Sequence, residues 1–420
     1  MREKKSSKRI RVLMLILLTV LVPAGCGNAV KSGYTSAEDS LQADSVSAGE
    51  EQTSDGGGAS ADKRENTYID EKAPEIKGLK YSDTMELSYA EGFRVDYYEE
   101  GYKIFQLRNG DAFILVPEGK EAPEDTEGYQ ILYAPLDHIY MAATSAMSLF
   151  DAIDAADAVT MTGTQQQGWY IDAPREAMKR GDMIYAGKYS SPDYEMLILN
   201  ECDAAIESSM IFHTPEVQEM LRDLDIPVFV DQSSYEKSSL GRSEWIRLYG
   251  AMMDREDEAA AYFEEQSRIM DEVSGYEETG KTVAYFSVNS DGSCVIRRPE
   301  DYVSEMIRKG GGEYVFDSLK ETDGNAATIT ISMEEFYSKA ADCDYLIYNS
   351  TIEGGLRDKE ELIGKNALFG EFSAVRKGNL WQVNRKMYQS TDKVSQFIRD
   401  VHIMLTDGDE AMLTFLEKVR

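Results

Sequence analysis

The sequence predicts an α/β protein of two lobes with mainly parallel sheets, joined by one long backbone helix and preceded by a small N-terminal antiparallel β unit. Short apolar runs alternate with amphipathic helical segments in both halves of the chain, which is typical of parallel sheets covered by helices. One apolar periodicity continues from Ser243 to Ser274, and polar and apolar residues alternate over Met85–Val116. Each lobe is therefore expected to contain its own sheet, with the connecting helix over 241–275.

The chain begins with a segment typical of a secretory signal. Residues 1–25 have a basic start, an apolar run over Val12–Val22 and small residues before Cys26. A cysteine at this point resembles a bacterial lipobox, with Pro23 where the usual motif has leucine, and the resemblance implies a lipid anchor on Cys26. The alternatives are an ordinary signal peptide or a single spanning helix, although the apolar run is shorter than the roughly 20 residues that a span needs.

Two further segments precede the α/β pattern. Residues 26–75 are rich in Ser, Gly, Asp and Glu, and they predict a disordered acidic linker because they lack the apolar content of a core. The N-terminal lobe is expected over 76–240 and opens with a β-hairpin unit at 79–118. Asn109-Gly110 between alternating runs is a good hairpin signal.

The α/β elements follow in order. In the first half, strands are expected at 139–143, 159–162, 204–206 and 228–230, and helices at 145–156, 193–199 and 215–224. In the second half, over 276–420, strands are expected at 282–288, 295–296, 345–348 and 380–383, and helices at 302–309, 333–340 and 392–405. Ser243 is a suitable N-cap for the connecting helix, and Gly275 is suitable for its end.

The two halves contain similar segments. Each has a helix-start signal, a glutamate, an apolar helix, a Cys-Asp pair and an apolar strand, in SPDYEMLILNECDAAI (191–206) and TISMEEFYSKAADCDYLI (330–347). Glu195 and Glu334 hold matching places. This predicts a duplicated lobe, with chance similarity between helix–strand units as the alternative.

Composition narrows the classes of function. The net charge of −32 makes nucleic-acid binding very unfavourable, and solubility is the simpler explanation of the acidity. Cys202, Cys294 and Cys343 show no close-spaced framework, so we expect buried thiols rather than a disulfide scaffold. The three histidines of the chain are too few for a histidine-rich metal centre, and no metal site is expected.

The loops that follow the strands supply the candidate ligand-binding residues, because ligands of parallel α/β sheets bind at the carboxyl ends of the strands. These loops, which include 387–389, are rich in aromatic rings, hydroxyls and guanidinium groups that suit a large, partly aromatic, anionic ligand. The candidates are Thr144, Ser145, Trp169, Tyr170, Ser209, Tyr235, Arg242, Arg297, Arg298, Tyr302 and Tyr348. Trp169 is alternatively a packing residue, and Arg297 and Arg298 are alternatively solvated or paired with Glu300 and Asp301.

Four segments resemble, in their order and spacing, the substrate-binding lipoproteins of ABC importers for iron complexes, haem and cobalamin. They are PLDHIYMAATSAMSLFDAIDAADAVTMTG, DYEMLILNECDAAI with LRDLDIPVFV, LGRSEWIRLYGAMMDREDEAAAYFEE, and EDYVSEMIRKGGGEYVF with ISMEEFYSKAADCDYLIY. The resemblance covers roughly residues 132–405. It implies two α/β lobes bridged by one rigid helix, no covalent cofactor, and a ligand that is an iron(III) chelate, haem or a corrinoid.

The same resemblance implies partners and a location. It implies that Glu195 and Glu334 contact an ABC permease. The alternative is that each glutamate only stabilises the start of its helix. The protein would be lipid-anchored at the extracytoplasmic face of the cell membrane. The alternative from another class is a lipid-anchored extracellular hydrolase. The chain has no Gly-x-Ser-x-Gly, His-Glu-x-x-His or P-loop motif, so we expect a binding protein and not an enzyme.

Overall fold

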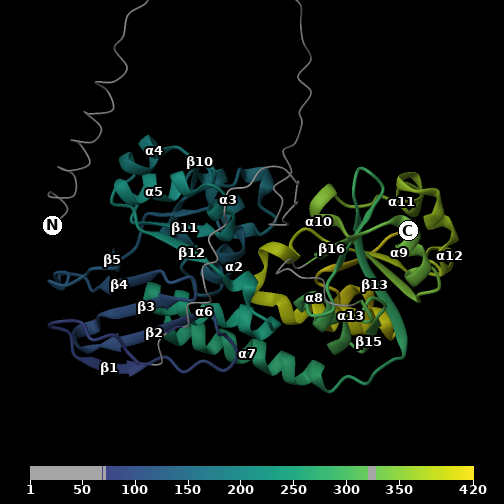
Figure 1. The fold of residues 1–420 in the computed structure, drawn as a ribbon, viewed down its shortest axis with the longest axis horizontal. Helices are drawn as coiled ribbons and strands as arrows, with labels where there is room; N and C mark the ends of the chain where they lie inside the picture. Colours follow the sequence, from purple (N-terminus) through teal and green to yellow (C-terminus); the bar gives the residue numbers. More distant parts are fainter. Residues whose placement is uncertain (1–68, 70–71, 320–327) are drawn as a thin grey trace, which may run out of the picture.

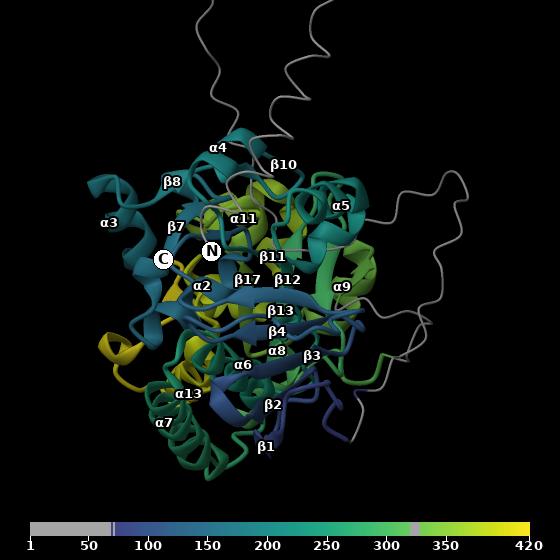
Figure 2. The same ribbon diagram turned by 90° about the vertical axis from the view of Figure 1, so that its left-hand side faces the viewer.

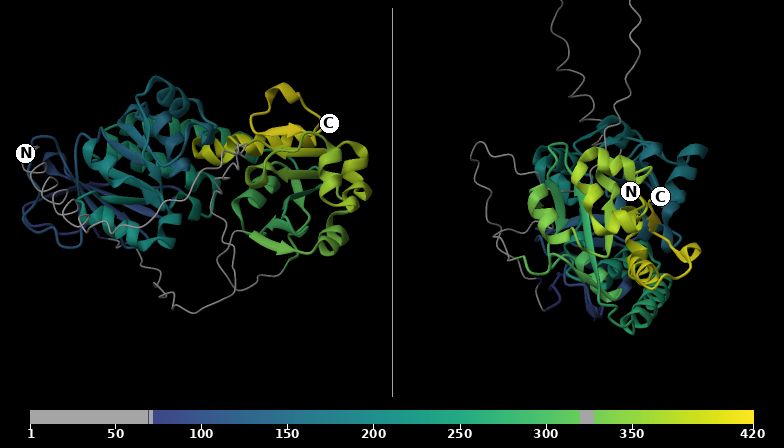
Figure 3. Two further views of the ribbon diagram at one scale, coloured as in Figure 1. Left: turned by 90° about the horizontal axis from the view of Figure 1, so that it is seen from above. Right: turned by 90° about the vertical axis from the view of Figure 1, so that its right-hand side faces the viewer.

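The computed structural model describes residue 69 and residues 72–319 and 328–420. The predicted signal, Cys26 and nearly all of the predicted linker lie outside the described residues. Within the described ranges, no helix is both long and apolar enough to cross a membrane. The chain forms an N-terminal sheet, a first lobe beside it and a second lobe at the far end of the molecule (Figure 1; Figure 3, left).

The N-terminal sheet has five strands, in the order β1-β2-β3-β4-β5. They are β1 (Tyr81–Thr84), β2 (Phe93–Tyr98), β3 (Lys103–Leu107), β4 (Ala112–Val116) and β5 (Gln130–Tyr133). The first four are antiparallel, and Gly110 makes the predicted turn with a φ of 86°. The predicted boundary at residue 118 is wrong, because β5 adds a fifth strand parallel to β4. The loop before β5 is charged and gives no hairpin signal.

The sheet of the first lobe is parallel throughout, with the order β12-β11-β6-β7-β8. Its strands are β6 (Ile139–Met141), β7 (Val159–Thr162), β8 (Ile184–Tyr185), β11 (Ala204–Ser208) and β12 (Val228–Asp231). Its helices are α2 (Thr144–Ala152), α3 (Asp172–Arg180), α4 (Tyr194–Leu199) and α5 (Pro215–Asp223), and β9 (Gly187–Lys188) pairs with β10 (Ser191–Pro192). Of these four helices, α3 was not predicted, because it is largely polar and buries only Pro174.

The sheet of the second lobe is mixed. Its order is β16-β14-β13-β17-β18-β19, and β15 also pairs with β13. The strands are β13 (Lys281–Val288), β14 (Cys294–Arg297), β15 (Gly312–Tyr314), β16 (Thr328–Ile331), β17 (Tyr345–Asn349), β18 (Leu380–Val383) and β19 (Leu416–Lys418). The helices are α8 (Tyr302–Lys309), α9 (Met333–Ala340), α10 (Ser350–Glu353), α11 (Lys359–Lys365), α12 (Ser373–Lys377) and α13 (Val394–Leu405). β14, β16 and β19 are antiparallel to their neighbours, and the other pairs are parallel.

The connection between the lobes corrects the prediction of one uninterrupted helix over 241–275. The segment forms α6 (Ser239–Met253) and α7 (Glu256–Ser274), which are separated at Asp254, a residue with a φ of 54°. Ser238 caps α6 in place of the predicted Ser243. The helices pack closely, since a Cβ at Gly250 would lie 2.5 Å from that of Ala259. Both bury an apolar face, so the periodicity continues through a break that no proline or glycine marks.

Only α7 therefore forms the link to the second lobe. Its 19 residues are about 28 Å long at 1.5 Å per residue. At the break, Lys103 of β3 donates to the carbonyl of Ala251 at 2.8 Å and to Asp254 at 2.7 Å. Just beyond the other end, the ring of Tyr276 stacks on His402 of α13, with centroids 3.6 Å apart. Figure 2 shows α7 beside the N-terminal sheet, which faces the viewer.

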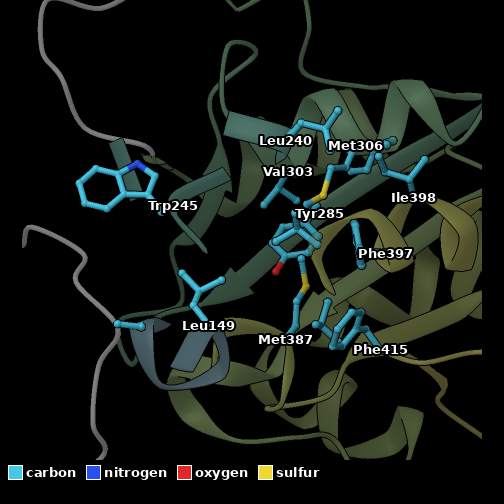
Figure 4. Close-up of a cluster of buried hydrophobic side chains, with 14 of the residues drawn as sticks. Leu149, Leu240, Trp245, Tyr285, Val303, Met306, Met387, Phe397, Ile398 and Phe415 are labelled. Atoms are coloured by element: carbon cyan, nitrogen blue, oxygen red, sulfur yellow. The ribbon is translucent and has the colours of Figure 1, made fainter. Parts of the chain in front are cut away.

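One apolar core continues through the N-terminal sheet, both lobes and the connecting helices. Where the lobes meet, Leu149 of α2 and Leu240 of α6 lie near Tyr285 and Met387 of the second lobe (Figure 4). The outer face of the first-lobe sheet has its own cluster around Tyr140 and Leu197. The boundary between the lobes is thus a packed seam whose base is apolar.

Candidate ligand-binding site

The loops that follow β7 and β18 contact each other across the seam. The backbone N–H of Tyr170 donates to Oε1 of Gln389 at 2.7 Å, and the Gln389 amide donates to the carbonyl of Gly168 at 2.9 Å. Arg385 donates to the hydroxyl of Tyr170 at 2.6 Å. Both loops follow the carboxyl ends of parallel strands, so they meet at the edge where ligands of this class of sheet bind.

A group of basic and phenolic side chains gathers in the same region. The guanidinium carbon of Arg242, in the first turn of α6, lies 4.1 Å from the ring centre of Tyr302. Arg297 donates to the hydroxyl of Tyr388 at 2.8 Å, and that hydroxyl lies 2.9 Å from the hydroxyl of Tyr285. We call these five residues the seam cluster. It joins the two lobes, because Arg242 precedes the connecting helix α7 and the other four residues follow it.

The seam cluster is buried and carries more positive than negative charge. Arg242 and Arg297 are 8% and 6% exposed. Oδ2 of Asp301 lies 3.9 Å from Nη1 of Arg297, and burial raises the pKa of Asp301. Burial also raises the pKa of Tyr302 to about 12, so its phenol stays neutral and able to donate a hydrogen bond. Forked guanidinium donors and phenols in a largely buried site suit a ligand with carboxylate or phenolate groups.

Of five other predicted residues, Thr144, Ser145, Ser209 and Tyr235 lie around the same edge of the two sheets, whereas Arg298 follows the antiparallel strand β14. Thr144 and Ser145 begin α2 directly after β6, and Ser209 follows β11. Tyr235 lies after β12 and is 58% exposed. Arg298 is half-buried, and its carbonyl accepts a hydrogen bond from Ser304 at 2.7 Å.

Two predicted aromatic residues do not line an open surface. Trp169 is 1% exposed and packs in the continuous core, which agrees with the alternative of a packing residue. Tyr348 is fully buried against Phe286, with ring centroids 5.6 Å apart. A ring at the end of a strand has the same sequence signature whether it turns into the core or into a cleft.

The prediction that Arg297 and Arg298 lie at the carboxyl ends of parallel strands is wrong. Both follow β14, which is antiparallel to β13, so they do not lie at the carboxyl edge shared by the parallel strands. Arg297 belongs to the seam cluster because its long side chain reaches the hydroxyl of Tyr388. The position of Arg297 in the site therefore depends on tertiary packing and not on its place at the end of a strand.

Sequence analysis missed four residues of the seam. Tyr388 and Gln389 lie in the loop at 387–389, which the carboxyl-end rule had selected without choosing a residue. Tyr285 lies inside a buried strand, where apolar patterning indicates core packing. Arg385 lies two residues beyond β18, and nothing in its sequence context distinguishes it from a solvated arginine.

A separate cavity of about 490 Å³ lies on the first lobe between α2 and α3. Acidic side chains dominate its wall, including Asp151, Asp157 and Asp172. Burial raises the pKa of Asp151, and the nearby Asp392 raises it further. This cavity has the wrong charge for an anionic ligand and contains no residue of the seam cluster.

The two predicted docking glutamates have equivalent settings. Glu195 and Glu334 are exposed at the second positions of α4 and α9, which belong to different lobes. The cap before each helix is a side chain that accepts a backbone N–H, namely Asp193 at 3.0 Å and Ser332 at 3.2 Å. Each carboxylate is thus presented on a capped helix start and faces solvent.

Two α/β lobes whose loops meet at a seam, linked by the helix α7, are typical of substrate-binding proteins. The chain belongs to the periplasmic binding protein family, whose model matches residues 141–384. The family and the structures that the chain resembles are substrate-binding proteins, not enzymes. The N-terminal sheet precedes the matched segment.

Known proteins with a similar sequence or fold are distant. An uncharacterised lipoprotein of Methanocaldococcus jannaschii is 24% identical over 329 residues, which cover 71% of this chain and 76% of that protein. The periplasmic haem-binding protein HutB of Vibrio cholerae has a TM-score of 0.53 and 13% identity, covering 64% of this chain and 98% of that one. A possible iron-binding protein of Staphylococcus epidermidis has a TM-score of 0.51 and 16% identity over the same shares. These two structures share the fold of the two lobes.

Proposed function

We propose that this protein is an extracytoplasmic, lipid-anchored solute-binding protein that captures a metal complex in the seam and delivers it to an ABC permease. The ligand class is an iron–siderophore complex, haem or a corrinoid. The seam cluster carries this proposal, because it brings two buried guanidinium groups together in a chain whose net charge is −32. The similar structures include a haem-binding protein and a possible iron-binding protein, and they support the same ligand classes.

A binding titration tests the ligand. Haem, a ferric catecholate, a ferric hydroxamate and cobalamin are each added to the purified protein, and binding is measured by calorimetry. We expect saturable binding of one class, because buried forked donors and phenols discriminate by the charge and shape of the ligand. No saturable binding by any of the four would overturn the proposed ligand.

Two variants locate the site. Arg242→Gln and Arg297→Gln should each weaken binding about tenfold or more, since a hydrogen bond to a charged group contributes roughly 1.5–3 kcal/mol. Arg268→Gln is the control, because Arg268 is exposed and pairs only locally with Glu265 on α7. Affinity that is unchanged in both seam variants would place the ligand elsewhere.

A transport assay tests the permease contact separately. Glu195→Ala and Glu334→Ala should reduce uptake while ligand affinity stays unchanged, because both carboxylates lie on exposed helix starts outside the seam. The neighbouring exposed Glu335→Ala is the control. Normal uptake in the double variant Glu195→Ala/Glu334→Ala would exclude this mode of docking.

The lipid anchor is tested by labelling with a fatty acid in a bacterial host. The wild-type chain should incorporate label and sediment with membranes, whereas Cys26→Ser should do neither. The curated relatives named as lipoproteins support this assignment. Incorporation that persists in Cys26→Ser would assign the anchor to another residue.

A further inference from the structure

The start of the first-lobe sheet holds a group of metal-ligand atoms that the sequence analysis did not expect. Asp137, His138 and Asp203 each offer one donor atom, and the three atoms lie within 4.8 Å of one another. Nδ1 of His138 is 2.9 Å from Oδ1 of Asp137 and 3.7 Å from Oδ2 of Asp203. His138 directly precedes β6, so it lies at the amino end of the strand, away from the seam.

We propose that Asp137, His138 and Asp203 bind a divalent transition-metal ion of the Zn²⁺ class at the amino ends of β6 and β11. Donors about 2.0–2.1 Å from a tetrahedral ion lie about 3.4 Å apart, and the two measured separations fall on either side of that spacing. One imidazole with two carboxylates suits Zn²⁺, Ni²⁺ or Cu²⁺ better than the oxygen-seeking Mg²⁺ or Ca²⁺. Water would complete the coordination, since the His138 side chain is 37% exposed.

Backbone hydrogen bonds hold the carboxylate of Asp203 in place before any metal binds. Oδ2 of Asp203 accepts the backbone N–H groups of Asp137 and His138, at 3.2 and 3.1 Å. The N–H of Asp203 in turn donates to the carbonyl of His138 at 3.0 Å. Ligands that are already oriented by hydrogen bonds bind a metal with less reorganisation.

The second lobe provides an internal comparison. Asp344 makes the matching connection, because its Oδ2 accepts the N–H of Thr282 at 3.0 Å and its own N–H donates to the Thr282 carbonyl at 3.1 Å. Lys281 and Thr282 stand where the first lobe has Asp137 and His138. In the second lobe the Thr282 hydroxyl also donates to Oδ2 of Asp344, at 3.1 Å. The connection is made there without a second carboxylate or an imidazole, so those two groups of the first lobe are not required for it.

This comparison supplies variants that are expected to fold. His138→Thr and Asp137→Lys place in the first lobe the residues that occupy the equivalent positions in the second. The full-length protein is used without a histidine tag and with Cys26→Ser, so that neither the tag nor this thiol binds the probe. Zn²⁺ is titrated by calorimetry, and Co²⁺ is followed by its visible absorption, which reports coordination number and geometry.

We expect one Zn²⁺ per chain and a rise in melting temperature as Zn²⁺ is added, because a ligand that binds only the folded state stabilises it. Loss of a residue that merely orients a ligand weakens metal binding about 10- to 100-fold, so loss of His138 itself should weaken it at least about tenfold. Asp137→Lys should abolish binding by adding a positive charge. Mg²⁺ should not compete.

Two controls separate this site from other metal-binding groups. His213→Ala removes another exposed histidine, and Asp172→Asn alters the acidic cavity between α2 and α3. Both should leave the Zn²⁺ titration unchanged. The proposal is overturned if Zn²⁺ does not bind saturably, if binding survives His138→Thr, or if Asp172→Asn removes it.

Discussion

Asp203 and Asp344 make equivalent connections between neighbouring strands: Asp203 connects β6 and β11 in the first lobe, and Asp344 connects β13 and β17 in the second. Each follows a buried cysteine and precedes a central strand, and each accepts a backbone N–H from the start of the neighbouring strand, at 3.1 Å from His138 and 3.0 Å from Thr282. The preceding thiols are also equivalent, since Cys202 and Cys343 lie 3.4 and 3.3 Å from the carbonyl oxygens two residues further on. This correspondence of backbone and side chains supports a duplicated lobe better than the sequence pattern alone.

The first prediction concerns the attachment of the N-terminal sheet. The fully buried carboxylate of Glu244 on α6 accepts the N–H groups of Ser88, Tyr89 and Ala90, at 2.9, 2.8 and 2.7 Å. Glu244→Gln removes the negative charge and replaces one acceptor oxygen by an NH₂ group, which cannot accept a hydrogen bond from these backbone N–H groups. It should lower the free energy of unfolding by about 1.5–3 kcal/mol, measured by urea denaturation. The exposed Glu264→Gln should change it little, and equal values for the two variants would contradict the argument.

The second prediction concerns the break between α6 and α7. Lys103 is 7% exposed and ties the carbonyl of Ala251 to Asp254 and Glu256. Lys103→Met leaves these acceptors without their cation, so it should cost about 1–3 kcal/mol of the free energy of unfolding. Lys120→Met breaks only an exposed pair with Glu100 and should cost less than about 1 kcal/mol. A Lys103→Met protein as stable as Lys120→Met would show that the break does not depend on this charge.

The third prediction concerns pH. Glu207 of β11 is fully buried, and within the described part of the chain neither of its carboxylate oxygens has a hydrogen-bond partner. Burial raises its pKa well above the ordinary value, so the folded protein holds a proton that the unfolded chain has released.

This difference fixes the sign of the effect. Above the carboxyl pKa of the unfolded chain, the free energy of unfolding of the wild type should fall, relative to Glu207→Gln, by about 1.4 kcal/mol per pH unit until the folded-state pKa is reached. Below the unfolded-state pKa the two curves should run parallel. Denaturation of both proteins over a series of pH values measures this, and curves that stay parallel throughout would rule out a buried neutral carboxyl.

The fourth prediction concerns the seam cluster. The hydroxyl of Tyr388 contacts both Arg297 and the hydroxyl of Tyr285. Tyr388→Phe should cost about 1–3 kcal/mol of stability, because it leaves buried polar groups with one partner fewer. It should also weaken binding of whichever ligand the titration identifies. Tyr81→Phe, at a hydroxyl on the exposed strand β1, is the control and should alter neither quantity.

Much of the fold was predictable because most elements are amphipathic and local. The bounds of α8, α9, β7 and β18 agree with the predicted ones, since each has a clear period and a nearby start or stop signal. The break at Asp254 was not predictable. Both helices bury an apolar face in the same core, so the sequence period does not report that the chain changes direction.

The site was predictable as a set of loops but not as a set of contacts. The carboxyl-end rule selected the loops of Tyr170 and Gln389, which meet across the seam. It failed for Arg297, because strand direction in a mixed sheet depends on pairing between distant residues. It also could not tell the buried ring of Trp169 from a ring in the cleft.

The sequence by itself determined the α/β class, the two-lobed organisation and the acidic surface, because hydrophobic period, turn residues and charge are local properties of the chain. Only the tertiary structure decided which side chains share a site. The partners of Arg297, His138 and Glu244 lie 91, 65 and 154 residues away, at Tyr388, Asp203 and Ala90. Contacts over such separations are set when the lobes and the N-terminal sheet bury a common apolar core, and no local pattern records them.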